Sequence, residues 1–226
     1  MVVLEMGNLC NIFSTEMWQF DNDDMDQFHP NIRTSSVNNE DLKQMILEKE
    51  KTEVSETLSN SGGWHSGGAL QNDKRFSALS DFIALGMKQI ISHNNDRDVD
   101  NVDIVISNAW ANVNRYRDFN EIHQHPGVHW AGVYYVDGPE NSGTIRFFDP
   151  RVVRQMIMPD ELLLQGRQHS QNLQYALAPR TGGMLIFPSW LQHAVRPNET
   201  KNPRISISFN IVLTPRIDQG LKPHYP

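Results

Sequence analysis

The sequence EIHQHPGVHWAGVYYV, residues 121–136, decides the fold that we expect for this chain. Alternate side chains of an extended strand leave the same face, so His123 and His125 can approach one cation together. A Pro-Gly turn follows, and the β-branched and aromatic run Ala131–Val136 predicts a buried strand. Two imidazoles beside a buried strand predict a metal site inside a β structure.

Similar runs of β-branched and aromatic residues lie on both sides of this stretch, separated by clusters of Gly, Pro, Asn and Asp. Such short runs between turn formers predict strands rather than helices. The predicted strands are Ile104–Ser107, Ala131–Val136, Thr144–Phe148, Met184–Phe187, Leu191–Val195 and Ile205–Leu213.

Two amphipathic helices are predicted before the strands. The first runs from Asn39 to about Glu53, behind residues that can cap a helix, and the second carries one apolar stripe. The apolar residues are Leu42, Met45 and Ile46 in the first helix and Leu79, Phe82, Ile83, Met87 and Ile90 in the second. Between them, SNSGGWHSGG (59–68) is too rich in Gly and Ser for a regular element, so we expect a loop anchored by Trp64.

Helices followed by many short strands predict an α+β domain, mainly β, whose core is an antiparallel barrel or jelly roll with the N-terminal helices packed on it. We expect a single domain over residues 1–226. Its parts would be a helical N-terminal part at 1–102, the β core at 103–215 and a tail at 216–226.

Composition and charge narrow the range of partners. The chain of 226 residues has 20 basic against 27 acidic side chains and a formal net charge of -7, without a run of Lys or Arg. We therefore expect neither nucleic acid nor an anionic membrane as a partner. The single cysteine, Cys10, cannot form an internal disulfide, which favours a reducing compartment. No apolar stretch approaches the ~20 residues that span a bilayer, and Met1–Asn8 lacks leader features, so we expect a cytoplasmic protein.

A third histidine and an arginine complete the predicted site. His193 lies 70 residues after His123, and Arg204 follows 11 residues later. In RISISFN, Arg204 and Ser206 share one face of a strand. The intervening RPNETKNP (196–203) predicts a hairpin that pairs the two strands, with metal and guanidinium about two or three residue steps of ~3.3 Å apart. That separation suits a short dicarboxylate that chelates the metal and accepts two hydrogen bonds from the arginine.

The same residues have simpler explanations. Two histidines on one strand are often surface or core residues. Arg204 could be an ordinary ion-paired residue at a sheet edge, and Ser206 could be merely small and polar. The order of the motifs, a His-x-His pair, a distant His and then Arg-x-Ser, favours the metal site.

Segments between Gly62 and Ile211 resemble the Fe(II)/2-oxoglutarate-dependent oxygenase superfamily, in particular the 2OG-Fe(II) oxygenases common in bacteria and marine phages. The matching segments are GGWHS (62–66), NAWANVN (108–114), HQHPGVHWAGVYYV (123–136), SGTIRFFDPR (142–151), GGMLIFPSWLQHAVRPN (182–198) and RISISFNI (204–211). Their linked order is much more specific than any single motif. The resemblance implies a double-stranded β-helix (jelly roll, cupin-like) core and, for a phage-encoded chain, a location in the host cytoplasm.

The resemblance also implies a chemistry. His123 and His193 would be the first and the distal ligand of Fe(II), and Arg204 with Ser206 would hold the C5 carboxylate of 2-oxoglutarate. The enzyme would be a dioxygenase, a hydroxylase that couples decarboxylation of 2-oxoglutarate to succinate with oxidation of an unknown substrate. Dioxygen would be the second cosubstrate, and ascorbate is a further candidate cofactor.

The second ligand departs from the superfamily pattern. Most members have Asp or Glu where this chain has His125. The expected metal-binding and catalytic residues are therefore the three neutral ligands His123, His125 and His193. Glu121, which shares a strand face with His123, is the alternative carboxylate ligand. A neutral set lowers the negative charge around the metal and leaves the choice of metal open.

Further residues are expected around the site. One of Tyr134 and Tyr135 should face it; we assign Tyr134 to 2-oxoglutarate binding, with packing in the core as the alternative. Asn112 is expected to bind in the same pocket or to end a strand. His129 is expected to support the site or the fold, and His65 to anchor its loop or border the substrate. The remaining histidines, expected to be solvated, are His29, His93, His169 and His224.

Two other functions stay open from the residues. A cupin-like three-His metal protein or enzyme would not use 2-oxoglutarate and would tolerate the loss of Arg204. A non-catalytic jelly-roll module would recognise a partner or carbohydrate without metal. The residues that select the substrate are expected in loops such as Arg151–Thr181, which is long enough for a lid and has a short-helix signal around Asp160–Leu164. No pattern defines the substrate or the oligomeric state.

Overall fold

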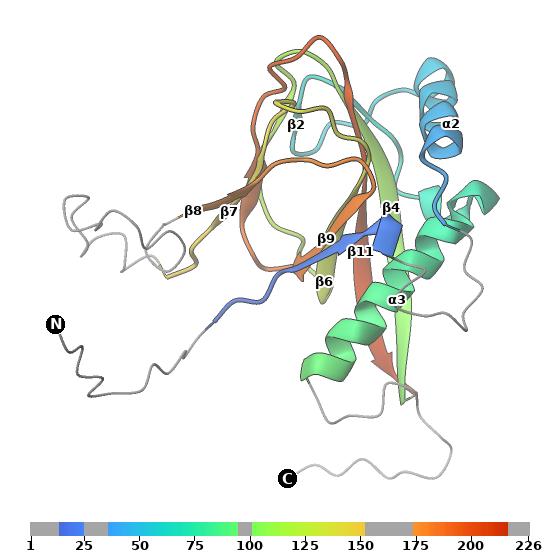
Figure 1. Cartoon of the computed structure of the whole chain (residues 1–226), viewed down its shortest axis with the longest axis vertical. Helices are drawn as coiled ribbons and strands as arrows, with labels where there is room; N and C mark the ends of the chain where they lie inside the picture. Colours follow the sequence, from blue (N-terminus) through green and yellow to red (C-terminus); the bar gives the residue numbers. More distant parts are fainter. Residues whose placement is uncertain (1–13, 25–35, 95–100, 152–173, 217–226) are drawn as a thin grey trace, which may run out of the picture.

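Two antiparallel sheets form the β core of the protein (Figure 1). The structure, a computed structural model, describes residues 14–24, 36–94, 101–151 and 174–216. The six-stranded sheet has the order β1 (Trp18–Asp21), β9 (Gly183–Pro188), β6 (Trp130–Asp137), β11 (Arg204–Pro215), β4 (Val102–Asn114) and β3 (Trp64–His65). The five-stranded sheet has the order β2 (Asn60–Ser61), β5 (Phe119–His123), β10 (His193–Val195), β7 (Ile145–Phe148) and β8 (Gln174–Leu177).

Alternation along strand β11 gives the six-stranded sheet one apolar and one polar face. The apolar residues belong to the main core and are Ile205, Ile207, Phe209 and Ile211. The polar residues line a cavity and are Arg204, Ser206, Ser208 and Asn210. The paired strand β4 repeats this pattern. A second apolar cluster, built mainly on β6, β7 and β9, packs between the two sheets.

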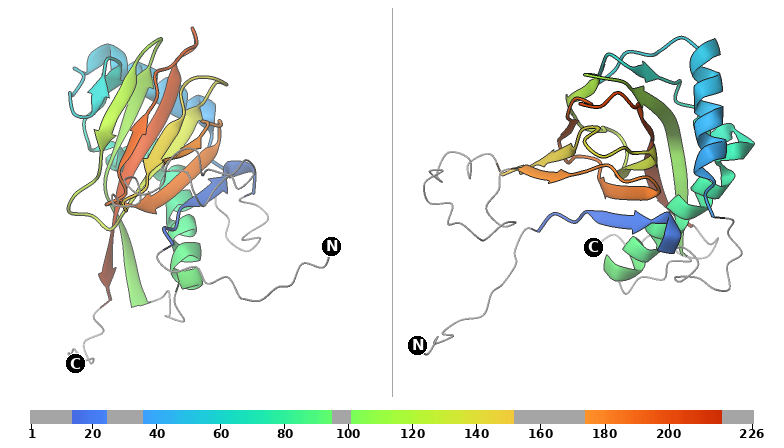
Figure 2. Two further views of the ribbon diagram at one scale, coloured as in Figure 1. Left: turned by 90° about the vertical axis from the view of Figure 1, so that its left-hand side faces the viewer. Right: turned by 45° about the horizontal axis from the view of Figure 1, so that its top comes forward.

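Helices α2 (Asn39–Thr52) and α3 (Ser77–Asn94) lie together over one side of the six-stranded sheet (Figures 1 and 2). Asn38 caps α2, because its side-chain oxygen accepts hydrogen bonds from the backbone N–H groups of Glu40 (3.1 Å) and Asp41 (3.3 Å). Short 3₁₀ helices are η1 (Asn22–Asp24), η2 (Leu70–Asn72) and η3 (Lys74–Phe76). The predicted apolar stripes of both α-helices are buried in the main core.

The predicted fold class, a mainly β jelly roll with N-terminal helices packed on it, is confirmed. Both predicted helices and all the predicted strands are present. The sequence did not reveal β1, β8 or the second half of β4 as strands. The alternating asparagines of β4 look like turn formers, yet their backbone is held in the ladder by β11. The expected loop 59–68 is also corrected, because it contains the two-residue strands β2 and β3, which pair with β5 and β4.

The predicted hairpin between the His193 and Arg204 strands is wrong. Strand β10 pairs with β5 and β7, whereas β11 pairs with β4 and β6, so the two strands lie in different sheets. Residues 196–203 cross between the sheets instead. Buried Asn198 organises this crossing: its Nδ2 donates to the carbonyls of Asn114 (3.0 Å) and Asn202 (2.8 Å). The turn-forming residues of this segment therefore build a crossover, and they place Arg204 on the opposite wall from His193.

Most of the predicted lid cannot be compared with the structure. Residues 152–173, including the expected short helix around Asp160–Leu164, lie outside the described ranges. The segment 174–177 that follows is strand β8, which pairs with β7. Among the helices of the described ranges, none is long and apolar enough to cross a membrane.

Gly132 provides a test of the packing of β6 between β9 and β11. A Cβ atom at this position would overlap the Phe209 ring and lie 2.6 Å from the carbonyl oxygen of Leu185. We expect Gly132→Ala to lower the free energy of unfolding by about 1–3 kcal/mol, as in other overpacked cores. Gly67→Ala is the matched control, since its added Cβ would meet only Glu56 Oε1 at 3.5 Å. Equal urea midpoints for the two variants would contradict this account.

Candidate metal centre

Three imidazoles converge at one end of strands β5 and β10. His193, the first residue of β10, lies directly opposite His123, the last residue of β5. His125 follows two residues later, beyond the end of the strand, and its backbone N–H donates to Ser189 O (2.9 Å). The expectation that both histidines lie on one strand is corrected in this respect. The ligand atoms of the three histidines all lie within 4.8 Å of one another.

Each of the three rings is oriented by a hydrogen bond at Nδ1 to an oxygen atom. The partners are Glu121 O for His123 (2.7 Å), Leu191 O for His193 (2.9 Å) and Asn210 Oδ1 for His125 (2.7 Å). Carbonyl oxygens only accept hydrogen bonds, so each Nδ1 must carry the hydrogen and each Nε2 holds a lone pair. This is the tautomer that binds a metal through Nε2.

The lone pairs face one another. The Nε2 atoms of His125 and His193 are 3.3 Å apart. Two unprotonated nitrogens at this distance repel each other unless a proton or a cation lies between them. Three neutral nitrogen donors on one side of a cavity suit Fe(II), Zn(II), Ni(II) or Cu(II), and they leave coordination positions open.

Burial keeps these rings neutral. Burial, with a smaller effect from the neighbouring His123 imidazole, lowers the pKa of His125 to about 4 and that of His193 to about 3. Burial also lowers the pKa of His123. At neutral pH the three ligands therefore need not lose protons before they bind a cation.

Arg204 is the buried cation of the site, with 1% of its surface exposed. Its Nη1 donates to the carbonyl oxygens of Ser142, Gly143 (3.3 Å) and Arg196 (3.4 Å). Its Nη2 is buried and has no hydrogen-bond partner among the described residues. Burial lowers the pKa of this guanidinium. A buried donor without a partner is costly, so this nitrogen points to a bound anion.

The histidines and the arginine line one cavity of about 400 Å³, which we call the site cavity. The three histidines come from the side of the five-stranded sheet, and Arg204 comes from the six-stranded sheet. Ser206 and Asn112, both predicted from the sequence, line the same cavity. Asn112 lies within β4 rather than at its end.

Tyr134 is not part of the site cavity, and its assignment to 2-oxoglutarate is corrected. Its hydroxyl donates to Asn39 Oδ1 (2.6 Å), and its ring packs edge-on against Phe82 of α3. The next residue, Tyr135, lines the cavity instead. Burial raises the pKa of Tyr135 to about 12, and the nearby charge of Arg204 opposes this shift. Alternation along β6 decides which tyrosine faces which side, and the sequence alone did not show the phase.

Three further residues considered in the sequence analysis, Glu121, His129 and His93, are placed by the structure. Glu121 is exposed, and the ligand group found in the described part of the chain contains only histidines. His129 accepts a hydrogen bond at Nδ1 from the backbone N–H of Leu213 (2.9 Å), which agrees with a supporting role in the fold. His93 is exposed, and its ring meets Trp18 edge-on. His29, His169 and His224 lie outside the described residues.

Comparison of the sequence with protein-family models finds one matching family. Residues 108–210 match the model of a family described as "Putative 2OG-Fe(II) oxygenase". The matched segment contains all three histidines of the metal centre and Arg204. Over residues 108–210 the chain is similar to the 2OG-Fe(II) oxygenase family. The three histidines in this segment could hold the metal that the family description names.

Solved structures similar to this chain share its fold. One is a prolyl-4-hydroxylase from Pseudomonas putida, 13% identical, with a TM-score of 0.53 over 88% of this chain and 93% of that one. Another is a prolyl hydroxylase from Trichoplax adhaerens in complex with a hypoxia inducible factor peptide fragment, 16% identical, with a TM-score of 0.54 over 87% and 83%. The epimerase SnoN of nogalamycin biosynthesis is 13% identical, with a TM-score of 0.55 over 81% and 77%. No match was found among curated proteins.

Two aromatic contacts of the candidate metal centre were not predicted from the sequence. Buried His65 stacks on Trp110 (ring centroids 5.7 Å, planes 19° apart), and Trp110 stacks in turn on His125 (5.7 Å, 22°). Both residues line the site cavity. His65 Nδ1 hydrogen-bonds to Ser66 O (2.7 Å). The even spacing of Asn108, Trp110 and Asn112 on one strand was the signal that could have placed Trp110 inside the cavity.

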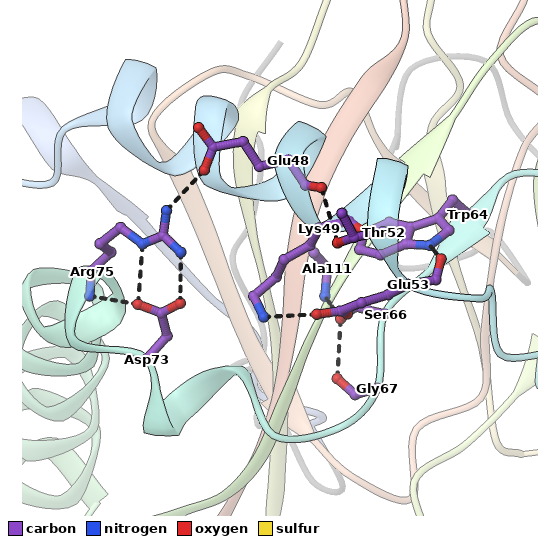
Figure 3. A network of polar contacts seen from close by, with 10 residues as sticks. All are labelled: Glu48, Lys49, Thr52, Glu53, Trp64, Ser66, Gly67, Asp73, Arg75 and Ala111. Carbon is purple, nitrogen blue, oxygen red and sulfur yellow. Dashed lines mark hydrogen bonds and ion pairs between the residues drawn. The ribbon is translucent and has the colours of Figure 1, made fainter.

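The segment that carries His65 is hydrogen-bonded to the rest of the chain on both sides (Figure 3). The indole N–H of Trp64 donates to Glu53 O (3.1 Å), just past the end of α2, so Trp64 anchors the loop as predicted. The hydroxyl of Ser66 accepts from the backbone N–H of Ala111 (2.9 Å) on β4. These bonds hold His65 against the site cavity.

The neutral histidines make the stability of the metal-free protein depend on pH. Unfolded histidines take up protons below the ordinary pKa of 6.5, whereas His125 and His193 in the folded protein do so only near 4 and 3. The unfolded chain thus binds more protons in this range, and stability is lost as the pH falls below about 6.5, by up to about 1.4 kcal/mol per pH unit for each histidine. Urea unfolding should show a weaker pH dependence for His193→Gln between pH 6.5 and 4. Equal slopes for wild type and variant would argue against buried neutral rings.

Proposed function

We propose that His123, His125 and His193 bind Fe(II) through Nε2, and that Arg204 binds the C5 carboxylate of 2-oxoglutarate in the same cavity. One observation supports this most strongly. Three nitrogen lone pairs converge on one wall of the site cavity, and a buried guanidinium nitrogen without a partner belongs to the other wall. A cation would satisfy the nitrogen lone pairs and a carboxylate would satisfy the guanidinium, and 2-oxoglutarate offers a metal-chelating end and a carboxylate end.

The neutral ligand set influences how the cosubstrate is held. With Asp or Glu as second ligand, a bound divalent cation would be partly neutralised by the protein. With His125 in that position the protein supplies no negative charge, so the cation attracts the dianionic cosubstrate with its full charge. Arg204 adds a second positive charge in a buried environment, where charge-assisted hydrogen bonds are strong.

Other residues of the six-stranded sheet complete the proposed cosubstrate site. Ser206 stands two residues after Arg204 and can donate its hydroxyl hydrogen to the same carboxylate. Tyr135 replaces Tyr134 in this role, because its ring lines the cavity near Arg204. Asn112, whose Oδ1 is buried without a partner in the described part, lines the same wall.

We propose a hydroxylase reaction for this site. Fe(II), with 2-oxoglutarate and dioxygen, supplies the oxidative decarboxylation to succinate and CO₂ and the transfer of one oxygen atom to a substrate C–H bond. The protein would orient 2-oxoglutarate between the histidines and Arg204, which line the same cavity. Two of the structurally similar proteins are prolyl hydroxylases, which supports hydroxylation as the reaction type.

The test is an anaerobic titration of the metal-free protein with Fe(II) and then with 2-oxoglutarate, followed by succinate measurement in air with ascorbate. We expect wild type to bind both and to form succinate slowly without a substrate. His193→Ala should lose tight Fe(II) binding. A wild-type protein that binds no Fe(II) would favour a non-catalytic jelly-roll module.

Arg204→Met separates the oxygenase from a cupin-like metal protein that does not use 2-oxoglutarate. We expect about a 100-fold weaker affinity for 2-oxoglutarate, because charge-assisted hydrogen bonds contribute about 1.5–3 kcal/mol, with Fe(II) affinity nearly unchanged. The control is Arg146→Met on β7, which replaces an arginine that does not line the site cavity. Calorimetry that gives the same 2-oxoglutarate affinity for Arg204→Met and wild type would support the cupin-like alternative.

Adjacent tyrosines allow a matched comparison. Tyr135→Phe should weaken 2-oxoglutarate binding about tenfold, since one hydrogen bond to a carboxylate is lost. Tyr134→Phe should leave this affinity unchanged and lower the free energy of unfolding by about 1 kcal/mol, because Asn39 Oδ1 loses its donor. The opposite result, weaker binding only in Tyr134→Phe, would mean that the tyrosines are assigned to the wrong sides of β6.

A further inference from the structure

We infer that Asn210, oriented by Asn108, is a positioning residue that sets the tautomer and ring orientation of His125 for metal binding. The inference rests on the proposed function, since it concerns a ligand of the proposed Fe(II) site. It assigns a role to the asparagine of RISISFN beyond the Arg-x-Ser pair.

His125 differs from the other two histidines in what holds its ring. The Nδ1 partners of His123 and His193 are backbone carbonyls two residues earlier in the chain, Glu121 O and Leu191 O. The Nδ1 partner of His125 is a side chain, Asn210 Oδ1 (2.7 Å), from strand β11 of the other sheet. The orientation of His125 thus depends on a residue that can be substituted without changing the local backbone.

The position of His125 increases this dependence. It lies beyond the end of β5, so the strand ladder does not fix it. The described structure holds it by the bond from its backbone N–H to Ser189 O, the hydrogen bond to Asn210 and the stacking on Trp110. Stacking restricts the ring plane, but it does not distinguish Nδ1 from Nε2. Asn210 makes that distinction.

An asparagine can make this distinction only if its own amide is oriented. The oxygen and the NH₂ group of an amide have nearly the same shape, and a rotated Asn210 would present NH₂ to His125. The ring would then accept at Nδ1 and carry its hydrogen on Nε2, where the metal should bind. Asn108 prevents this rotation, because its Oδ1 accepts a hydrogen bond from Asn210 Nδ2 (2.9 Å).

The pairing of β11 with β4 places the side chains of Asn210 and Asn108 next to each other. Asn210 on β11 is the register partner of Asn108 on β4, and both face the site cavity. Asn210 is also 9% exposed, so water competes little for its amide. If Asn210 and Asn108 served only to join the two strands, Asn210 Oδ1 would not need to contact the His125 ring. Partners of this kind typically change metal affinity 10- to 100-fold when they are removed.

The experiment uses the full chain, with Co(II) as the metal probe in competition with a chelator and 2-oxoglutarate added afterwards. The variants are Asn210→Leu, which keeps the approximate shape without the acceptor, and Asn210→Asp, which keeps an acceptor. Asn120→Leu is the control, since Asn120 lines the same cavity but its Nδ2 donates to Ser59 Oγ (3.3 Å). The tautomer of His125 in the metal-free proteins is read from ¹⁵N chemical shifts of the imidazole nitrogens.

We expect Asn210→Leu to bind Co(II) 10- to 100-fold more weakly and to lose the pure Nδ1–H tautomer of His125. Asn210→Asp and Asn120→Leu should keep both properties of wild type. If Asn210→Leu does not fold, Asn108→Leu gives the same readout, because it frees the Asn210 amide to rotate without removing it. An unchanged tautomer and Co(II) affinity in these variants would overturn the assignment, as would an equal loss in Asn120→Leu.

The behaviour of the wild-type protein distinguishes failure of the Asn210 inference from failure of the proposed function. If wild type binds neither Co(II) nor 2-oxoglutarate, the proposed function is overturned and the inference with it. If wild type binds both and Asn210→Leu binds Co(II) equally well, only the role of Asn210 is overturned.

Discussion

The pairing of strands β5 and β10 is the constraint on which the candidate metal centre depends. It sets His123 opposite His193, although 70 residues separate them in the chain. Residues directly opposite in an antiparallel pair have Cβ atoms about 4.5–5.5 Å apart, a distance at which two imidazoles can share one cation. A slip of one residue would turn one ring to the outer face. The strand register and the metal centre are therefore a single structural requirement.

One face of the six-stranded sheet packs in the main core, and residues of the other face line the site cavity. The sheet's apolar side chains and the two helices form the main core on one side, while the other side presents Arg204, asparagines and serines to the cavity. This explains how a polar interior is tolerated: most of the apolar burial that stabilises the fold lies elsewhere. It also explains why Tyr134 and Tyr135, adjacent on β6, belong to different environments.

The similarity to the 2OG-Fe(II) oxygenase family over residues 108–210 and the neutral set of three histidines are compatible on physical grounds. The carboxylate that most members supply is replaced by His125, and the described structure shows how such a ring is held: an oxygen acceptor at Nδ1, an aromatic face at Trp110 and burial that keeps it neutral. Asn210, a side chain from the opposite sheet, is part of the same arrangement.

The sequence by itself determined the local features. Capping at Asn38 and apolar spacing predicted the helices, β-branched runs predicted most strands, and the motif order predicted the residues that gather around the cavity. Only the tertiary structure decided that β10 and β11 lie in different sheets, that Tyr135 rather than Tyr134 faces the cavity, and that His125 is held by Asn210. The physical reason is that spacing and turn propensity act over a few residues. Strand partners, the phase of a strand's faces and side-chain hydrogen bonds between sheets depend on residues far away in the chain.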